Sequence, residues 1–220
     1  MNAYQLGLQR RLHRSFAMLL VLCILCVGFG IVTFHVKMSV RDTDVRSTTV
    51  VPLLLNSGVV QSKEAEVNII LWFEEGNIPQ DIMTKRPMED WVWTSNSLAT
   101  RGGNTAVTLS GRHLVNKNEE NNLFTWYTTI AQELTKVGGK IYIDERVPQA
   151  IDVSAYLCQI NALPAQCALL GNMVSIAAYQ TNIRTDVTAG KDRINIQLLS
   201  RGKNTDGQSV LAMPALLEEF

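Results

Sequence analysis

Residues 123–147 read LFTWYTTIAQELTKVGGKIYIDERV and contain the clearest helix and one of the clearest strands of the chain. Apolar residues recur at steps of three and four through residues 123–137, which is the spacing of one helical face. Gly138-Gly139 then ends the helix. Residues 140–147 alternate between apolar and polar side chains, as a half-buried strand does. The stretch therefore predicts a helix followed directly by a strand.

Similar patterns extend in both directions. Further helices are predicted at 49–60 and 152–163, and further strands at 66–73, 91–98, 105–114, 172–180, 193–200 and 208–216. A weak repeat, Ile78-Pro79-Gln80 and Val147-Pro148-Gln149, divides the domain into halves of residues 48–115 and 121–220. The predicted fold is a pseudo-duplicated, saddle-like α+β domain over residues 48–220, with an antiparallel sheet covered by helices on one face.

A charge-free run precedes this domain. Residues 16–34 read FAMLLVLCILCVGFGIVTF, and no acidic residue occurs before Asp42. A run of this length without charge predicts a transmembrane helix, placed at residues 16–36. Three basic residues stand just before it: Arg10, Arg11 and Arg14.

These arginines favour a cytoplasmic N-terminus under the positive-inside rule. The predicted topology is a cytoplasmic tail at 1–15, a span or uncleaved signal at 16–36, a linker at 37–47 and a domain outside the inner membrane. The same run also fits a signal peptide cleaved after Gly30, which would make the domain secreted.

The charge distribution argues against a nucleic-acid-binding protein. The whole chain carries 20 basic and 20 acidic residues, but 16 basic and all 20 acidic residues follow the apolar run and its flanks, giving a net charge of −4. Affinity for nucleic acid comes mainly from neutralising phosphates with Lys and Arg. We therefore expect no nucleic-acid partner.

The four cysteines fall into two pairs. Cys23 and Cys26 lie inside the apolar run and are interpreted as small apolar residues. Cys158 and Cys167 lie in the domain, where an oxidising compartment favours pairing. The sequence predicts a disulfide between them, with two buried thiols as the alternative.

Few residues suit catalysis or metal binding. The three histidines, His13, His35 and His113, are too scattered for a His-based metal site, and any Ser/His/Asp chemistry would rest on His113 alone. The acidic pairs Glu74-Glu75 and Glu119-Glu120 indicate solvated turn residues, because neighbours on a strand point apart. No catalytic residue, cofactor or metal ligand is predicted.

The tryptophans offer the one candidate surface. Trp91 and Trp93 share one strand face by the period of two. Core packing is the default for such residues. The alternative is an exposed platform that binds a partner protein or a glycan.

The C-terminal part of the chain resembles the end of YwmB-like proteins. The features that carry the resemblance are Ala178-Tyr179 at a strand end, Gly190 in a turn, the strand at 193–199, Gly207, and the acidic-aromatic end Glu218-Glu219-Phe220. The resemblance implies an exported, membrane-anchored α+β domain with a fold like the TATA-box-binding protein. It supplies no catalytic residue, since the function of that family is not established. The chain departs from the family in its short segment at 78–86 and in its cysteine pair.

These observations predict a cell-envelope binding domain without catalytic activity. It would contact the membrane through residues 16–36 and bind an envelope protein or a glycan. The alternative is a bitopic subunit of a secretion or conjugation machine. A cell-wall-active enzyme is third, because it would need a cleft with paired carboxylates or an activated nucleophile.

Overall fold

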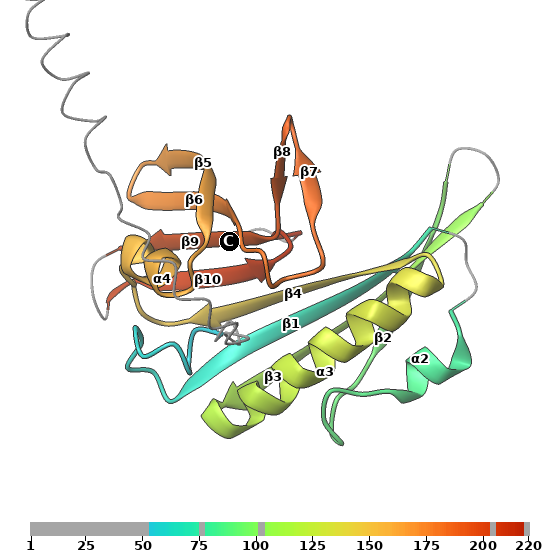
Figure 1. Cartoon of the computed structure of the whole chain (residues 1–220). Coiled ribbons are helices and arrows are strands. Elements are labelled where there is room, and N and C mark those ends of the chain that lie inside the picture. The colour runs from blue at the N-terminus through green and yellow to red at the C-terminus, as the bar shows by residue number, and fades with distance from the viewer. Residues whose placement is uncertain (1–52, 75–77, 101–103, 203–205, 218–220) are drawn as a thin grey trace, which may run out of the picture. The chain divides into compact units, whose positions relative to one another are not determined.

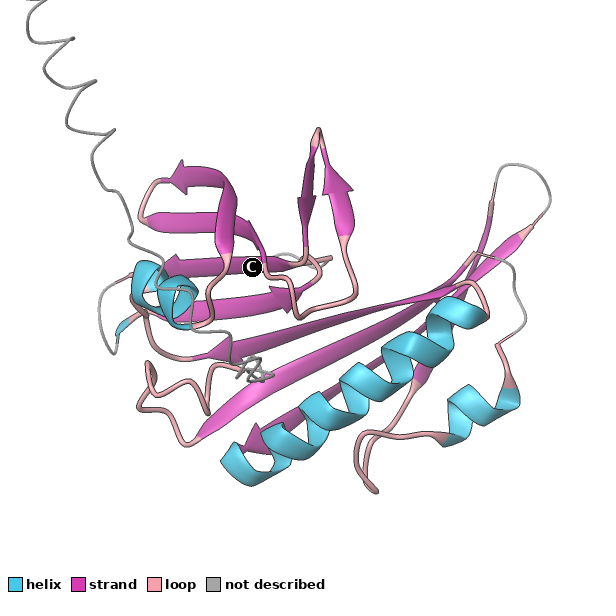
Figure 2. Ribbon diagram, in the orientation of Figure 1, coloured by secondary structure: helices cyan, strands magenta, loops and turns pink. Residues whose placement is uncertain are grey.

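An antiparallel sheet of eight strands dominates the part of the chain that the structure describes (Figures 1 and 2). The computed structural model describes residues 53–74, 78–100, 104–202 and 206–217. All of them belong to one compact unit, Thr48–Phe220.

The sheet has the order β2-β3-β1-β4-β10-β9-β6-β5, so β2 and β5 form its two edges. A separate hairpin, β7-β8, follows β6 in the chain. The bounds of the strands are β1 Glu64–Phe73, β2 Thr94–Ala99, β3 Thr105–Asn116, β4 Gly139–Val147, β5 Leu163–Leu170, β6 Met173–Tyr179, β7 Val187–Ala189, β8 Asp192–Ile194, β9 Ile196–Arg201 and β10 Gln208–Met213.

Three helices lie among the described residues: α2 Gln80–Thr84, α3 Lys117–Lys136 and α4 Val153–Gln159. Figure 1 shows α3, the longest, running along the sheet at β1 and β3. It starts before residue 123, the predicted start, because Asn116 caps it. The Asn116 side chain accepts hydrogen bonds from the backbone N–H of Asn118 and of Glu119, and the Glu119 carboxylate accepts one from the Asn116 N–H.

The hydrophobic core lies between α3, α4 and one face of the sheet. Alternate residues of β1 (Val67, Ile69 and Leu71) are fully buried on this face, as the period of a strand requires. They pack with an apolar stripe of α3 that includes Leu123, Tyr127, Ile130 and Leu134. They also pack with the buried residues of α4, which are Val153, Tyr156 and Leu157. Burying each large side chain contributes roughly 1.5–3 kcal/mol.

The predicted α+β class with an N-terminal transmembrane helix is wrong. The described residues are mostly antiparallel sheet, with 45% in strands and 21% in helices. No helix among them is long and apolar enough to cross a membrane. The predicted tail 1–15, span 16–36 and linker 37–47 lie outside the described residues. The membrane and signal-anchor assignments therefore find no support in the structure.

The prediction of two equivalent halves is corrected as well. The first half supplies only β1, β2 and β3, on one side of the β1–β4 contact. The second half supplies β4, β10, β9, β6 and β5 on the other side, together with the β7-β8 hairpin. The two halves therefore contribute unequal numbers of strands to the sheet. The two edge strands also differ in amino-acid composition.

Two of the predicted helices differ in the structure. Residues 53–60 were predicted to be helical, but they form turns, with the Ser57 N–H donating to the Leu54 carbonyl at 3.2 Å. The predicted helix 152–163 begins as expected, where Asp152 accepts a hydrogen bond from the Ala155 N–H, but it ends at Gln159. Asn161 then takes a left-handed conformation, with φ of 52°, and the chain enters β5.

Candidate binding surface

Edge strand β5 is the most unusual surface of the described domain. All eight of its residues are exposed, and both Leu169 (74% exposed) and Leu170 (60% exposed) present most of their side chains to solvent. The strand pairs with β6, and no described strand pairs with its other side. Its outer backbone N–H and C=O groups therefore form a template that another strand can extend.

This edge carries no charge. No Asp, Glu, Lys or Arg occurs between Asp152 and Arg184, a stretch that includes β5 and β6. Native sheets usually protect their edges with charged side chains, with proline or with a bulge. Here Pro164 and a register shift between Pro164 and Gln166 protect only the first part of β5. The part from Gln166 to Leu170 is left as an uncharged edge.

Side chains next to β5 extend the apolar surface. On β6, Met173, Val174 and Ile176 are half-buried. Val174 and Ile176 line a hollow of about 490 Å³. Its other residues come from the start of α4 and the loop before it, from the β5-β6 turn and from the end of β9: Ala150, Ile151, Asp152, Val153, Ser154, Asn172, Ser200 and Gly202. The β5-β6 hairpin thus presents an open backbone edge next to a hollow of mixed polar and apolar lining.

Contacts to a neighbouring hairpin hold β5 in place. The Gln166 side-chain amide donates to the Ala189 carbonyl at 2.8 Å and to the Asp192 carboxylate at 3.1 Å, both in the β7-β8 hairpin. Together with the ladder to β6, these bonds fix the strand before any partner arrives. A preformed edge loses less conformational entropy on binding.

The opposite edge differs in chemistry. Strand β2 is also exposed along its whole length, but its sequence is TSNSLA. Its side chains are mainly hydroxyl and amide groups, with Leu98 as its exposed large apolar residue. This edge favours water over an apolar partner strand.

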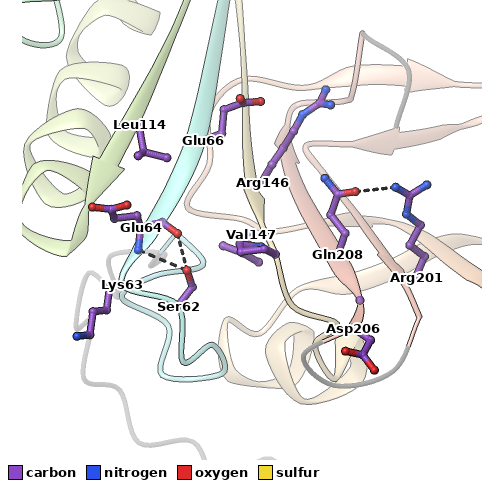
Figure 3. A pocket seen from close by; sticks show the side chains of 12 residues that line it. Ser62, Lys63, Glu64, Glu66, Leu114, Arg146, Val147, Arg201, Asp206 and Gln208 are labelled. Atoms are coloured by element: carbon purple, nitrogen blue, oxygen red, sulfur yellow. Dashed lines mark hydrogen bonds between the residues drawn. The ribbon is translucent and has the colours of Figure 1, made fainter.

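A second hollow lies where β1 begins and β4 ends (Figure 3). This open groove of about 600 Å³ is lined by three basic side chains, Lys63, Arg146 and Arg201, and by three acidic ones, Glu64, Glu66 and Asp206. The two signs are mixed, and the Arg201 guanidinium donates to the Gln208 amide oxygen at 2.8 Å. The groove therefore favours neither an anion nor a cation.

Below the surface, the structure brings together two carboxylates that are distant in sequence. Glu120 of α3 is 1% exposed and Glu145 of β4 is fully buried. They bind the backbone of three consecutive residues. The Leu54 N–H donates to Glu145, the Leu55 N–H donates to both carboxylates at 2.7 and 3.2 Å, and the Asn56 N–H donates to Glu120 at 3.0 Å. The interpretation of Glu120 as a solvated turn residue is wrong.

The environment of Glu145 favours its protonated form. Burial raises the pKa of the Glu145 carboxyl well above its usual value, and the adjacent Glu120 raises it further through charge repulsion and a hydrogen bond. The N–H groups of Leu54 and Leu55 act in the opposite direction. Burial, together with both carboxylates, also raises the pKa of the Tyr156 hydroxyl. The pair is closed to solvent, so it fixes the segment at 54–56 and does not reach a substrate.

The two cysteines that were predicted to pair are free thiols in the structure. Cys158 lies on α4 and Cys167 on β5, and both side chains are exposed. The structure therefore contains no bridge between them. Cys167 lies in the middle part of the edge strand, opposite Ile176 of β6.

The two tryptophans that were predicted to share a strand face precede β2 and differ in exposure. Trp91 is 1% exposed and lies against β3, where a Cβ atom added at Gly111 would come within 2.3 Å of the Trp91 indole nitrogen. Trp93 is half-buried, with its ring 5.6 Å from Trp91 and 6.3 Å from Trp126. Trp91 is thus part of the core, and only Trp93 reaches the surface.

Comparison with known proteins adds no identification. No protein-family model matches this chain, and no curated protein matches it. The resemblance to YwmB-like proteins stays a prediction. Any functional assignment therefore rests on the geometry of the described domain.

Sequence reasoning missed both β5 and the buried carboxylate pair. A signal for β5 was present, since residues 153–183 form the longest uncharged stretch of the domain. No local signal marks the carboxylate pair, because Glu120 and Glu145 receive their hydrogen bonds from residues more than 60 positions away.

Proposed function

We propose that this domain is a non-catalytic binding module that takes up an extended, uncharged segment of a protein partner as an additional strand on β5. The observation that carries the proposal is a fully exposed, apolar and uncharged edge strand. The proposal assigns no reaction to the domain.

Strand addition combines two kinds of interaction. The outer N–H and C=O groups of β5 give main-chain hydrogen bonds that do not depend on the sequence of the partner. Leu169 and Leu170 project on opposite faces, because successive side chains of a strand alternate. An added strand with apolar side chains on both faces would cover each of them, and burial contributes about 25 cal/mol per Å² of apolar surface.

The absence of charge sets the specificity. A partner strand with a charged residue opposite β5 would lose water around that charge and find no opposite charge on this edge. An uncharged strand avoids this cost. The module should therefore discriminate against charged segments more than among uncharged ones.

The other two functions predicted from the sequence differ in how well they agree with strand addition on β5. A subunit of a secretion or conjugation machine would also need a protein-binding edge, so that role is compatible with strand addition. An enzyme would need reactive groups that a substrate can reach, and the paired carboxylates of Glu120 and Glu145 are buried. A location outside the inner membrane stays a prediction on which strand addition does not depend.

A peptide-binding experiment tests the proposal. We would titrate the full chain into a fluorescein-labelled peptide of about ten alternating Val and Thr residues, a length that matches a typical strand, and follow the anisotropy. A second peptide carries lysine at its two central positions. We expect the uncharged peptide to bind at least about tenfold more tightly, which corresponds to roughly 1.4 kcal/mol.

Two matched variants locate the site. Leu169→Lys places a charge on β5, and Leu98→Lys places the same charge on β2, at a residue of similar exposure. Only the first should weaken the binding of the uncharged peptide, again by about tenfold or more. Equal binding by both variants, or no binding of either peptide by the parent chain at concentrations where it is monomeric, would refute the proposal.

A further inference from the structure

We infer that the strand which β5 takes up is β5 of a second copy of this chain, so that two sheets join across a two-fold axis. The inference rests on the proposed function, since it names the partner at the same edge. The argument has three parts: the symmetry of the pairing, the absence of charge and the contrast with β2.

Symmetry restricts how β5 meets its own copy. A two-fold axis perpendicular to the sheet makes the two strands antiparallel and places one residue directly opposite its own copy. An axis at Cys167, near the middle of Leu163–Leu170, uses almost the whole strand. It sets Gln166 opposite Ala168 in the regular part of the strand, beyond the register shift that leaves Ala165 without a partner on β6.

The lack of charge suits a self-association. In a two-fold pairing, a strand that carries several charges of one sign brings like charges close together, which destabilises the sheet. Between Asp152 and Arg184 the chain has no charged residue. This edge therefore meets its own copy without electrostatic repulsion, and no compensating charge is needed on a partner.

The two edges of the sheet differ in how well they fit β5. Pairing with β2 of another copy would place Leu169 and Leu170 against a strand of mainly hydroxyl and amide side chains. Pairing with a second β5 places Cys167 against its own copy on one face, and it brings Leu169 and Leu170 to a strand on which Gln166 is the one polar amide side chain. A β5–β2 contact would be head-to-tail and would close only where its rotation forms a ring, whereas a two-fold β5–β5 contact closes after two copies.

The polar features of β5 do not oppose the pairing. The Gln166 side chain is already bonded to Ala189 and Asp192 of the same copy. Pro164 has no N–H group, so the ladder weakens only near its two symmetry-related ends. At the central residues, from Gln166 to Ala168, the outward-facing backbone N–H and C=O groups can form hydrogen bonds with the second copy.

The first experiment measures the oligomeric state by sedimentation velocity. The full chain, its Leu169→Lys variant and its Leu98→Lys variant are compared over a range of concentrations. We expect the parent chain and Leu98→Lys to form dimers, and Leu169→Lys to lose the dimer at the same concentrations. Near-ultraviolet circular dichroism, which reports the packing of Trp91 and Trp93, checks that each variant is folded. A dimer that survives Leu169→Lys overturns the inference.

A charge-pair rescue separates a lost contact from a damaged fold. With the axis at Cys167, Leu169 of one copy lies diagonal to Cys167 of the other, on the same face of the sheet and within reach of long side chains. Mixing the Leu169→Lys chain with a Cys167→Glu chain places the two new charges next to each other in a heterodimer, whereas Cys167→Glu alone sets two glutamates opposite each other. We expect the mixture to recover dimer that neither chain forms alone. A mixture that stays monomeric contradicts the assigned pairing.

Cys167 gives a second readout of the axis. In a background with Cys23, Cys26 and Cys158 replaced by serine, Cys167 is the only thiol. Residues directly opposite in an antiparallel pair have Cβ atoms about 4.5–5.5 Å apart, close to the separation that a disulfide needs. Mild oxidation should therefore cross-link two copies through Cys167. A dimer that resists this oxidation places the axis elsewhere and overturns the assignment.

The outcomes distinguish this inference from the proposed function. A chain that binds the uncharged peptide on β5 but stays monomeric refutes only the second copy as partner. A chain that neither binds the peptide nor dimerises refutes both. If both hold, the peptide competes with the second copy, and its apparent affinity should weaken as the chain concentration rises.

Discussion

Glu120 and Glu145 form a buried acidic pair, and each of the two carboxylates accepts hydrogen bonds from backbone N–H groups. The N–H groups of Leu54, Leu55 and Asn56 point at the two carboxylates, and the Asn56 side-chain amide donates to Glu120 as well. Two negative charges in this position would repel each other strongly at low dielectric. A proton on Glu145 removes that repulsion, and the remaining carboxylate oxygens still accept hydrogen bonds from the turn at 54–56.

This arrangement makes stability depend on pH. Because the folded-state pKa of Glu145 lies above the unfolded value of about 4.3, the folded state holds more protons above that pH. The contribution of this group is complete below its unfolded pKa and is lost as the pH rises through its folded pKa. We expect the free energy of unfolding to fall with rising pH, by at most about 1.4 kcal/mol per pH unit.

Urea unfolding at several pH values between about 5 and 9 measures this slope, in a range where an ordinary tyrosine stays protonated. The control is Glu145→Gln, which keeps the shape but cannot ionise and should flatten the profile. An identical pH profile for the parent chain and Glu145→Gln would show that the pair does not hold the extra proton.

Gly111 is required by the ring that lies against it. A Cβ atom at this position would approach the Trp91 indole to 2.3 Å at its nitrogen and to 2.7 Å at the next ring carbon. Trp91 is buried and has little room to move. We expect Gly111→Ala to destabilise the fold by about 1–3 kcal/mol, as overpacking does. Ser110→Ala on the same strand is the control, and chemical denaturation of both variants should separate them clearly.

At the scale of the element, α3 depends on its capping box. The Asn116 side chain accepts hydrogen bonds from the N–H groups of Asn118 and Glu119 at 2.9 and 3.2 Å. Asn116→Ala should therefore lower the free energy of unfolding by about 1 kcal/mol. Asn121→Ala, at an exposed position inside the same helix, should change it little or raise it slightly, because alanine is the better helix former. Thermal denaturation compares the two, and equal losses would contradict the capping assignment.

The elements that could be predicted from the sequence are those whose pattern is set by one buried face. Strands β1, β3 and β4 and helix α3 alternate or repeat because one side packs on the core, and their positions were predicted with shifted ends. Strand β5 has no buried residue, so it shows no alternation to detect. The turn at 54–56 was missed for another reason, because carboxylates distant in sequence bind N–H groups that a helix would otherwise have used.

The binding surface could be predicted only in part. The uncharged stretch from 153 to 183 is visible in the sequence, but its position at a sheet edge follows from long-range pairing of β6 with β9. Trp91 illustrates the reverse case. Its spacing from Trp93 predicts a shared strand face, with core packing as the default and an exposed platform as the alternative. In the structure Trp91 is buried and Trp93 is not, and the absence of a side chain at Gly111 lets the Trp91 ring pack against β3.

At the scale of the whole described domain, the sheet has two unlike edges. The β2 edge is polar and the β5 edge is apolar and uncharged. A contact through β5 alone forms a closed dimer of two copies. The two polar β2 edges then lie at the outer ends of the joined sheet. An open apolar edge on a free chain would be an aggregation risk, and pairing through β5 removes it.

Hydrogen–deuterium exchange of the full chain at increasing concentration tests the central claim, that β5 accepts another strand, most directly. Strand addition gives new hydrogen bonds to the outer amides of β5, which slows their exchange, while the β2 amides keep the same surroundings. We expect exchange in Leu163–Leu170 to slow as the concentration rises, and exchange in Thr94–Ala99 to stay constant. Exchange in β5 that is independent of concentration, in both the presence and the absence of the uncharged peptide, would contradict the account.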